Sequence, residues 1–316
     1  MYRFIKKIFI FISIFILSFI GVFICDRVFL GNQYLGSYQA AILDKAERLE
    51  SIDEPKILLI GNSNVCFGMN SALLEEEMGM PVVDMGLHHG LGNAFLENVV
   101  NLGVSEGDIV IVCHSGFADD DTISDPDLAW ITLEHHNDLW KIVRFKDIPR
   151  LIEAFPKYLT SAVISFIRGE RWNTPPEDTC YSRKAFNKYG DIVLRFNDYY
   201  VFSGKEGAVP SINDICINRL NQLNDHLSDK GATLLIAAYP ICRGENSKDP
   251  SAFDEFENEL RTRLNCEVIS HYTDYFFPYT MFYNHPLHLT EEGAEIRTQL
   301  LISDLKKWKN KSLFSR

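Results

Sequence analysis

Residues 56–64 read KILLIGNSN, and this stretch decides the fold. Lys56–Ile60 is a short, continuously apolar run, which is typical of a strand in a parallel sheet that is covered on both faces. The letters GNSN then indicate a turn, and a helix is expected over Asn70–Met78, where Gly79 provides a C-terminal cap. Strand, turn and helix in this order predict one unit of an α/β fold.

The same alternation recurs along the chain. Further strands are predicted at Pro81–Asp84, Asp108–Cys113, Thr233–Ala238 and Cys266–Ile269. Helices are predicted near Asn93–Leu102, between a cap at Ser211 and Gly231, and from Thr290 onward. Strands that alternate with helices predict a doubly wound, flavodoxin-like parallel sheet of about five strands.

One long segment lacks this alternation. Between about 117 and 209 the alternation of predicted strands and helices is lost, and a segment of this length is too long for a loop. We expect a mainly helical cap insertion there, with an amphipathic helix around Ile148–Ile167, inside a domain that covers 55–316. Its tryptophans are Trp130, Trp140 and Trp172. Aromatic rings stack on sugars, but burial in a core is the favoured interpretation.

The N-terminus differs from the rest of the chain. Ile8 to Cys25 is an uncharged, mostly apolar run, and eighteen helical residues rise about 27 Å, close to a hydrocarbon core of roughly 30 Å. Arg3, Lys6 and Lys7 precede it, which places the N-terminus in the cytoplasm and the C-terminal domain outside. Because no small-x-small cleavage site follows, we expect residues 1–25 to be an uncleaved transmembrane signal anchor rather than a signal peptide, with 26–54 as a polar stalk.

Composition excludes some classes of protein. The net charge is −12 and no basic stripe is present, so nucleic acid is not an expected partner. Six cysteines follow the anchor at irregular spacing, which does not predict a disulfide framework. No CxxC is present, so the sequence gives no sign of a structural zinc site.

Polar residues gather where the predicted strands end. These segments are Gly61–Asn64, Met85–Gly90, His114–Gly116 and, before the last helix, Tyr283–Thr290. In an open α/β sheet, ligands bind outside the carboxyl ends of the strands. We therefore expect these four segments to meet at one edge of the sheet.

Two of these segments resemble motifs of the SGNH/GDSL hydrolases. The GNSN turn is similar to the GDS block of that family, with Asn62 in place of the usual Asp. HLTEEG, residues 288–293, is similar to the terminal block, in which the base histidine precedes a helix, and Gly86 lies where the second block has an oxyanion-hole glycine. Apart from the insertion, the resemblance covers about Lys56–Lys307. It is specific because order, spacing and strand context agree.

The subgroup that the chain resembles most consists of membrane-anchored SGNH-like proteins of cell-envelope polysaccharide acylation. Proteins of teichoic-acid D-alanylation and of alginate acetylation belong to it. The segments FNKYGD at 186–191 and AAYP at 237–240 are also similar to that subgroup.

The resemblance implies acyl-transfer chemistry. Ser63 would be the nucleophile, His288 its general base and Asn284 the group that orients the imidazole. The oxyanion-hole or substrate-binding residues would be Gly86, Asn64, His114, Ser115 and His285. Ser63 could instead simply cap a helix. The sequence also departs from the family pattern, because the position of the acidic third member is taken by Asn284 or His285 and the third block lacks its Asn.

We expect an extracytoplasmic serine esterase or O-acyltransferase that needs no cofactor. Its substrate would be an acylated glycan or envelope polymer, and a membrane acyl-transfer protein would be a possible partner. The alternative is a catalytically degenerate SGNH scaffold that binds polysaccharide or a membrane partner, which the two departures favour. A zinc site is a third, less favoured hypothesis, because no helical HxxxH spacing is present. It would use some of the histidines His88, His89, His114, His285 and His288.

Overall fold

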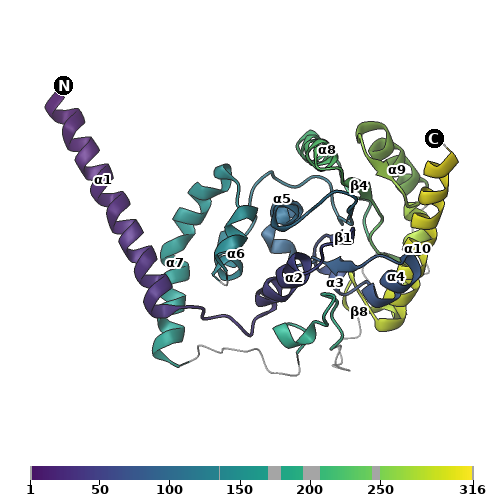
Figure 1. The fold of residues 1–316 in the computed structure, drawn as a ribbon, viewed down its shortest axis with the longest axis horizontal. Helices are drawn as coiled ribbons and strands as arrows, with labels where there is room; N and C mark the ends of the chain where they lie inside the picture. Colours follow the sequence, from purple (N-terminus) through teal and green to yellow (C-terminus); the bar gives the residue numbers. More distant parts are fainter. Residues whose placement is uncertain (1, 135, 170–178, 195–206, 244–249, 315–316) are drawn as a thin grey trace.

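The computed structural model describes residues 2–134, 136–169, 179–194, 207–243 and 250–314. A parallel sheet lies at the centre of the body, and a long N-terminal helix projects from it (Figure 1). The strands run in the order β2-β1-β3-β4-β6. They are β1 (Ile57–Ile60), β2 (Val82–Asp84), β3 (Ile109–Val112), β4 (Thr233–Ile236) and β6 (Glu267–Val268). The predicted α/β fold with a parallel sheet of about five strands is confirmed.

Helices cover both faces of this sheet. Successive side chains of a strand point to opposite faces, so Leu58 and Leu59 enter two separate cores. The first core is shared with α2 (Ala41–Glu50), α5 (Asn93–Glu97), α8 (Asp214–Asp229) and α9 (Ser251–Arg263). The second is shared with α3 (Ser63–Cys66), α4 (Ser71–Met78) and α10 (Glu291–Phe314). This double cover explains why the central strands are apolar at every position.

Smaller elements complete the body. Two-stranded sheets pair β5 (Ile241–Arg243) with β7 (Phe276–Pro278) and β8 (Phe282–His285) with β9 (His288–Leu289). Short helices are η2 (Tyr38–Ala40), η3 (His89–Leu91), η4 (Asn98–Leu102), η7 (Arg183–Ala185), η8 (Tyr272–Tyr275) and η9 (Tyr279–Met281). Helix α8 begins later than predicted, because the side chain of Asn213, and not Ser211, accepts the hydrogen bond from the Cys216 amide that caps it.

The insertion is helical in its first half. It contains α6 (Pro126–Leu133), η5 (Asn137–Ile142), η6 (Phe145–Asp147) and α7 (Ile148–Ile167), the last as predicted. Trp130 is buried in the core and stacks on Tyr158. Trp140 is partly buried and packs edge-on against Trp130. Trp172 lies outside the described residues. The second half of the insertion was expected to cover the strand ends, but part of it lies along the edge of the main sheet. Its Tyr189 carbonyl accepts the Asp84 amide at the edge of the main sheet.

The segment expected to be a stalk belongs to the domain instead. Helix α2 buries Ile42 and Leu49 in the first core. The polar pattern was misleading because Lys45 is also buried, where its ammonium group donates to the carbonyls of Asp84 and Gly190. Gln33 is also buried, and its backbone amide donates to the Glu134 carboxylate, so the segment before α2 packs against the domain as well.

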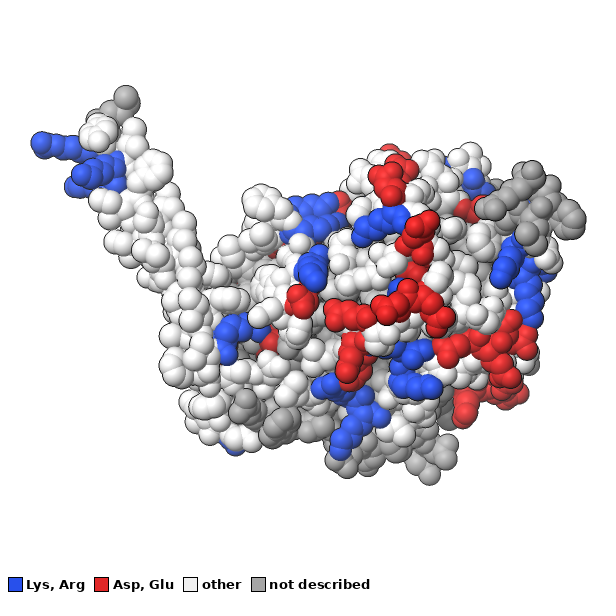
Figure 2. Space-filling model, in the orientation of Figure 1, with Lys and Arg blue, Asp and Glu red and all other residues white. Residues whose placement is uncertain are grey.

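The N-terminal helix α1 (Tyr2–Cys25) continues into the short π-helix η1 (Asp26–Leu30). Among the described residues it is the one helix long and apolar enough to cross a membrane, which is compatible with a single anchor or a signal sequence. Its free end carries the basic residues Arg3, Lys6 and Lys7 (Figure 2). On the body, basic and acidic side chains are interspersed on the face shown, without a basic stripe (Figure 2).

Candidate active site

Ser63 stands at the start of α3, directly after the end of β1. The turn between them requires glycine at position 61, because a Cβ there would lie 2.5 Å from Val65 Cγ2 and 3.0 Å from the Cys113 carbonyl oxygen. Asn62 caps the helix: its Oδ1 accepts the Asn64 amide at 3.0 Å. Ser63 does not have this capping role, and its hydroxyl group is left for another partner.

That partner is His288, which is 225 residues away in the sequence. Ser63 Oγ and His288 Nε2 are 2.8 Å apart, so the predicted convergence of these two residues is confirmed. The imidazole is 5% exposed and stacks face to face on Phe67, with ring centroids 3.9 Å apart and planes 7° apart. This stack fixes the plane of the ring.

Asn284 makes the second contact of the imidazole. Its Oδ1 lies 2.7 Å from His288 Nδ1, while its Nδ2 donates to the Tyr181 hydroxyl at 3.1 Å. In this orientation the amide oxygen faces the imidazole and can only accept, so Nδ1 carries the proton. His288 Nε2 is then the acceptor for the Ser63 hydroxyl, which is the tautomer that a general base needs.

Asn64, predicted as a substrate-binding residue, is buried beneath the Ser63 turn and holds the neighbouring residues in place. Its side chain is fully buried and donates to Asn62 Oδ1 at 2.7 Å and to the Cys113 carbonyl at 2.9 Å. Arg297 of α10, also fully buried, donates to the Asn64 carbonyl at 2.6 Å. Burial lowers the pKa of Arg297, and Gly68 leaves room for its guanidinium group, because a Cβ there would lie 2.5 Å from Nη1. Asn64 is therefore a positioning residue, and nothing in its contacts faces a substrate.

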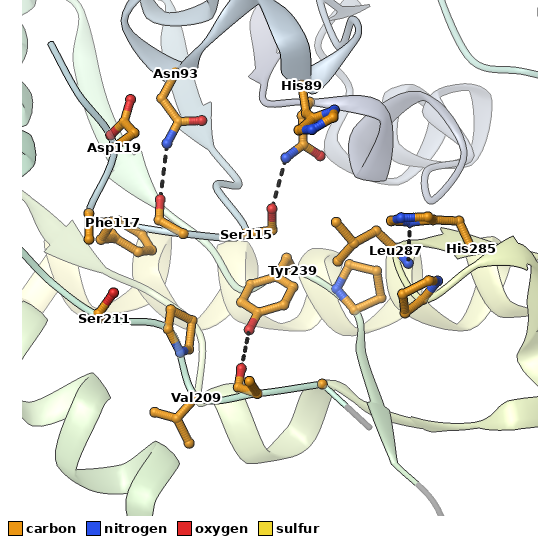
Figure 3. A pocket seen from close by; sticks show the side chains of 18 of the residues that line it. His89, Asn93, Ser115, Phe117, Asp119, Val209, Ser211, Tyr239, His285 and Leu287 are labelled. Atoms are coloured by element: carbon orange, nitrogen blue, oxygen red, sulfur yellow. Dashed lines mark hydrogen bonds between the residues drawn. The ribbon is translucent and has the colours of Figure 1, made fainter. Parts of the chain in front are cut away.

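Ser115 is held at the edge of the site. Its Oγ accepts a hydrogen bond from Asn62 Nδ2 at 2.8 Å, as the close-up shows (Figure 3). An Asp at position 62, which the family resemblance would lead one to expect, has no hydrogen to donate to this oxygen. Asn62 thus joins the Ser63 turn to the loop after β3.

Two predicted site residues are engaged elsewhere. The Gly86 amide donates to Asp84 Oδ1 at 2.6 Å, so this N–H is not directed at a ligand. His114 is fully buried, and its Nε2 lies 2.7 Å from Glu97 Oε1, away from Ser63. The structure does not bring either group into the site, because a nearby carboxylate binds each one.

Of the other predicted histidines, His285 lies beside His288. The ring of His285 is 4.9 Å from that of His288, and its Nδ1 accepts the Leu287 amide at 3.3 Å. Burial, with a contribution from His89, lowers the pKa of His285. Among the residues that the structure describes, no group of three or more His, Cys, Asp or Glu side chains could hold a metal ion.

A cavity of about 670 Å³ opens next to the Ser63–His288 pair. Asn62 and Ser115 form one wall, and His285 and Leu287 form another, so the cavity borders the neighbours of Ser63 and His288 (Figure 3). Other lining residues include His89, Asn93, Phe117, Asp119, Ser124, Tyr239 and residues 207–211. The four predicted strand-end segments therefore meet, as expected, with the segment 207–211 in addition.

The sequence did not predict several residues that hold the site residues in place. Tyr181 lies in the aperiodic insertion, and Phe67 carries no motif. Arg297 stands nine residues after His288 on the last helix, where a basic residue is normally exposed. Its position in the HLTEEG helix was the one available signal.

No protein-family model, curated protein or solved structure matches the chain. The fold and the site define its class directly. It is an α/β protein with a five-stranded parallel sheet that places a serine, a histidine and an asparagine in hydrogen-bonded sequence beside a cavity.

Proposed function

We propose that the chain is an SGNH-type serine esterase or O-acyltransferase of the cell envelope. The observation that carries this proposal is the 2.8 Å contact between Ser63 Oγ and His288 Nε2. In the reaction, Ser63 attacks an acyl carbonyl while His288 takes its proton, and Asn284 stabilises the Nδ1–H of the imidazolium. The alcohol then leaves with that proton, and an acyl ester remains on Ser63.

Two groups are suited to stabilise the oxyanion. The Ser63 amide stands in the first turn of α3 and has no intrahelical acceptor. The Ser115 oxygen accepts from Asn62, so its hydroxyl hydrogen remains for a ligand. Donors placed where the negative charge develops lower the barrier of acyl transfer. Ser115 would thus act where the family pattern has an Asn.

The cavity supports a sugar as the alcohol part of the ester. Its wall carries polar side chains such as Asn93, Asp119 and Ser124, while the lining residues Phe117 and Tyr239 are themselves buried. Such polar side chains can bind hydroxyl groups. We therefore propose an acylated glycan or envelope polymer as substrate. Water or a second sugar hydroxyl would accept the acyl group, which a membrane acyl-transfer partner would supply in the second case.

Packing at the base of α1 supports an uncleaved anchor. Phe19 contacts Phe155, and Phe23 contacts Trp130 and Trp140 of the insertion. A signal peptidase cut after α1 would remove these aromatic partners and uncover the core residues Trp130 and Phe155. We propose a single span with a cytoplasmic N-terminus, which protease added to spheroplasts tests: the domain after Cys25 should be digested, and full protection would contradict this topology.

A fluorophosphonate label tests the chemistry. Full-length wild-type protein in detergent should be labelled, and Ser63→Ala should lose the label at an unchanged melting temperature. Thr290→Ser, a conservative change next to the site, is a matched control and should be labelled like wild type. A folded wild type that resists the label, and that also cleaves no acyl ester, would favour the degenerate polysaccharide-binding scaffold. Two observations favour that alternative: the Gly86 amide is bound to Asp84, and the residue that contacts His288 Nδ1 is the neutral Asn284.

A further inference from the structure

Arg297 of α10 is a fully buried cation beneath the turn that carries Ser63. Its guanidinium group donates to three uncharged acceptors, which are the Asn64 carbonyl at 2.6 Å, Asn64 Oδ1 at 3.0 Å and the Ala238 carbonyl at 3.2 Å. In the described part of the chain no carboxylate forms an ion pair with it. Burying a charge without a counter-charge costs free energy, and a neutral donor would serve the same acceptors. Packing alone therefore does not account for a charged residue at this position.

A series of hydrogen bonds leads from Arg297 to the cavity. Arg297 Nη2 donates to Asn64 Oδ1 at 3.0 Å, and Asn64 Nδ2 donates to Asn62 Oδ1 at 2.7 Å. Asn62 Nδ2 then donates to Ser115 Oγ at 2.8 Å, and Ser115 lines the cavity (Figure 3). We name Arg297, Asn64, Asn62 and Ser115 the amide relay, because two side-chain amides connect its ends.

The direction of every bond in the amide relay is fixed by neighbours that have only one role. An arginine can only donate, so Asn64 presents its oxygen to Arg297, and its nitrogen faces the Cys113 carbonyl at 2.9 Å. The backbone N–H of Asn64 can only donate, so it holds the oxygen of Asn62. The Asn62 nitrogen must then face Ser115 Oγ, and the hydroxyl hydrogen of Ser115 remains for a group in the cavity.

We propose that Arg297 acts through the amide relay to make the Ser115 hydroxyl a stronger donor to the oxyanion of acyl transfer. This inference rests on the proposed function and deepens it. Hydrogen bonds that point the same way polarise one another, and a cation at the start of the series draws electron density from each later donor. Burial strengthens the effect, because water does not screen it. Arg297, Asn64 and Asn62 are thus positioning residues, and Ser115 is the member that touches the substrate.

A double-mutant cycle tests this proposal, with full-length protein in detergent and p-nitrophenyl acetate as the ester. Ser115→Ala should lower kcat by about 100-fold, because it removes one donor to the oxyanion. Arg297→Gln should lower kcat by about tenfold and leave KM within about twofold, because the relay acts only on charge that develops in the transition state. In the Ser115→Ala background, Arg297→Gln should cost less than about twofold, since the donor on which it acts is gone.

A matched control removes a different cation from the same helix. Lys306 of α10 is exposed and pairs with Glu77, with 2.6 Å between Nζ and Oε2. Lys306→Gln should keep kcat within about twofold of wild type, because an exposed charge is screened by water. Thermal unfolding alongside shows whether each variant is folded at the assay temperature.

Position 62 provides a second way to break the amide relay, which does not depend on the stability of Arg297→Gln. Asn62→Asp keeps an oxygen for the Asn64 amide, which Asn62 Oδ1 accepts at 3.0 Å. The carboxylate has no hydrogen for Ser115 Oγ and instead accepts the hydroxyl hydrogen of Ser115, which is then lost to the substrate. Asn62→Asp should therefore lower kcat about as much as Ser115→Ala, and the double variant should lie within about twofold of either single variant.

The outcomes separate the amide relay from the proposed function. Equal losses for Arg297→Gln with and without Ser115 would mean that Arg297 acts through packing, which overturns the relay. A kcat near wild type for Asn62→Asp would also overturn it. In both cases the active wild type keeps the esterase proposal intact. A folded wild type that neither cleaves the ester nor accepts a fluorophosphonate would refute the proposed function, and the relay with it.

Discussion

Two buried histidines stand at the carboxyl end of the sheet region, and their surroundings differ in charge. His288 lies between the neutral groups of Ser63 and Asn284 and borders the cavity through its neighbours. His114 follows β3, is fully buried, and pairs with Glu97. Arg219 completes this second cluster, with 2.7 Å between its Nε and Glu97 Oε2.

The comparison shows that partners, and not residue type, separate a reactive group from a structural one. Burial by itself would raise the pKa of Glu97, but the hydrogen bond of His114 and the charge of Arg219 outweigh it and leave this pKa below its ordinary value. Glu97 is thus a carboxylate held by its neighbours, which suits a permanent network. The hydrogen bonds that His288 makes with Ser63 and Asn284 are to neutral groups, and a hydroxyl is within reach, which suits a group that gains and loses a proton.

The largest expected effect comes from the reactive histidine. His288→Gln should lower the rate of acyl-ester cleavage by about 10⁴-fold or more, because it removes the base of the nucleophile. The melting temperature should change little, since glutamine keeps much of the buried volume. Steady-state kinetics on a chromogenic ester, with thermal unfolding alongside, measure both. A loss below tenfold would mean that another group deprotonates Ser63.

A substitution in the cluster of His114, Glu97 and Arg219 should instead lower stability and leave the reactivity of Ser63 nearly unchanged. Glu97→Gln leaves Arg219 without its buried carboxylate partner and should lower the free energy of unfolding by about 3 kcal/mol. Denaturant unfolding of the purified protein measures this loss. The fraction of Ser63 that reacts with a fluorophosphonate at low temperature should stay within about twofold of wild type, because the cluster does not touch the reacting atoms. Lost labelling in a protein that is still folded would show that the two clusters are coupled.

The same cluster predicts a dependence of stability on pH. The pKa of Glu97 is lower in the folded state than its ordinary value of 4.5, so its contribution is fully present above that value. It is lost as the pH falls through the folded pKa. Between pH 5 and 3 the wild type should therefore lose more stability than Glu97→Gln. Equal slopes for the two proteins would show that Glu97 is not the group responsible.

Much of the sheet could be predicted from sequence because its strands are buried on both faces. The apolar runs at 57–60, 109–112 and 234–236 give a signal that does not depend on the rest of the chain. The short pairs β5–β7 and β8–β9 carry no such signal, since their pairing depends on tertiary contacts. Helix α2 was misassigned for a similar reason: a buried Lys45 is predictable only when its acceptors are known.

The site was predictable where order and spacing carried information. Ser63, Asn284 and His288 followed from the resemblance of GNSN and HLTEEG to SGNH/GDSL motifs in matching order and strand context, and the structure places the three residues in contact. Gly86 was predicted from the same resemblance, and His114 from its place after the third strand. A strand end brings a residue near the edge of the sheet, but whether a neighbouring carboxylate binds it is decided by side-chain geometry.

A smaller effect is expected at the third member of the site. Asn284→Ala should reduce ester cleavage by about 100-fold, because the imidazole loses the acceptor that fixes its tautomer. Asn284→Asp should keep or raise the rate, since a carboxylate accepts the same hydrogen bond and stabilises the imidazolium. His285→Ala is the control and should change kcat less than threefold. If His285→Ala were damaging and Asn284→Ala silent, the roles of these two residues would be exchanged.

The smallest expected effect lies one step further out, at Tyr181. Its hydroxyl accepts from Asn284 Nδ2 and so supports the orientation in which the amide oxygen faces His288. Tyr181→Phe removes this restraint, and one lost hydrogen bond of about 1 kcal/mol predicts a roughly fivefold lower kcat.

Double variants show whether this restraint is the cause. The carboxylate of an Asp at position 284 has two equivalent oxygens, so either orientation places an acceptor opposite His288 Nδ1. Tyr181→Phe should therefore cost less than twofold when it is made in the Asn284→Asp background. Steady-state kinetics of the four proteins complete a double-mutant cycle, whose coupling measures the orientation of the amide. Equal losses in both backgrounds would mean that Tyr181 acts through packing against its neighbours and not through the asparagine.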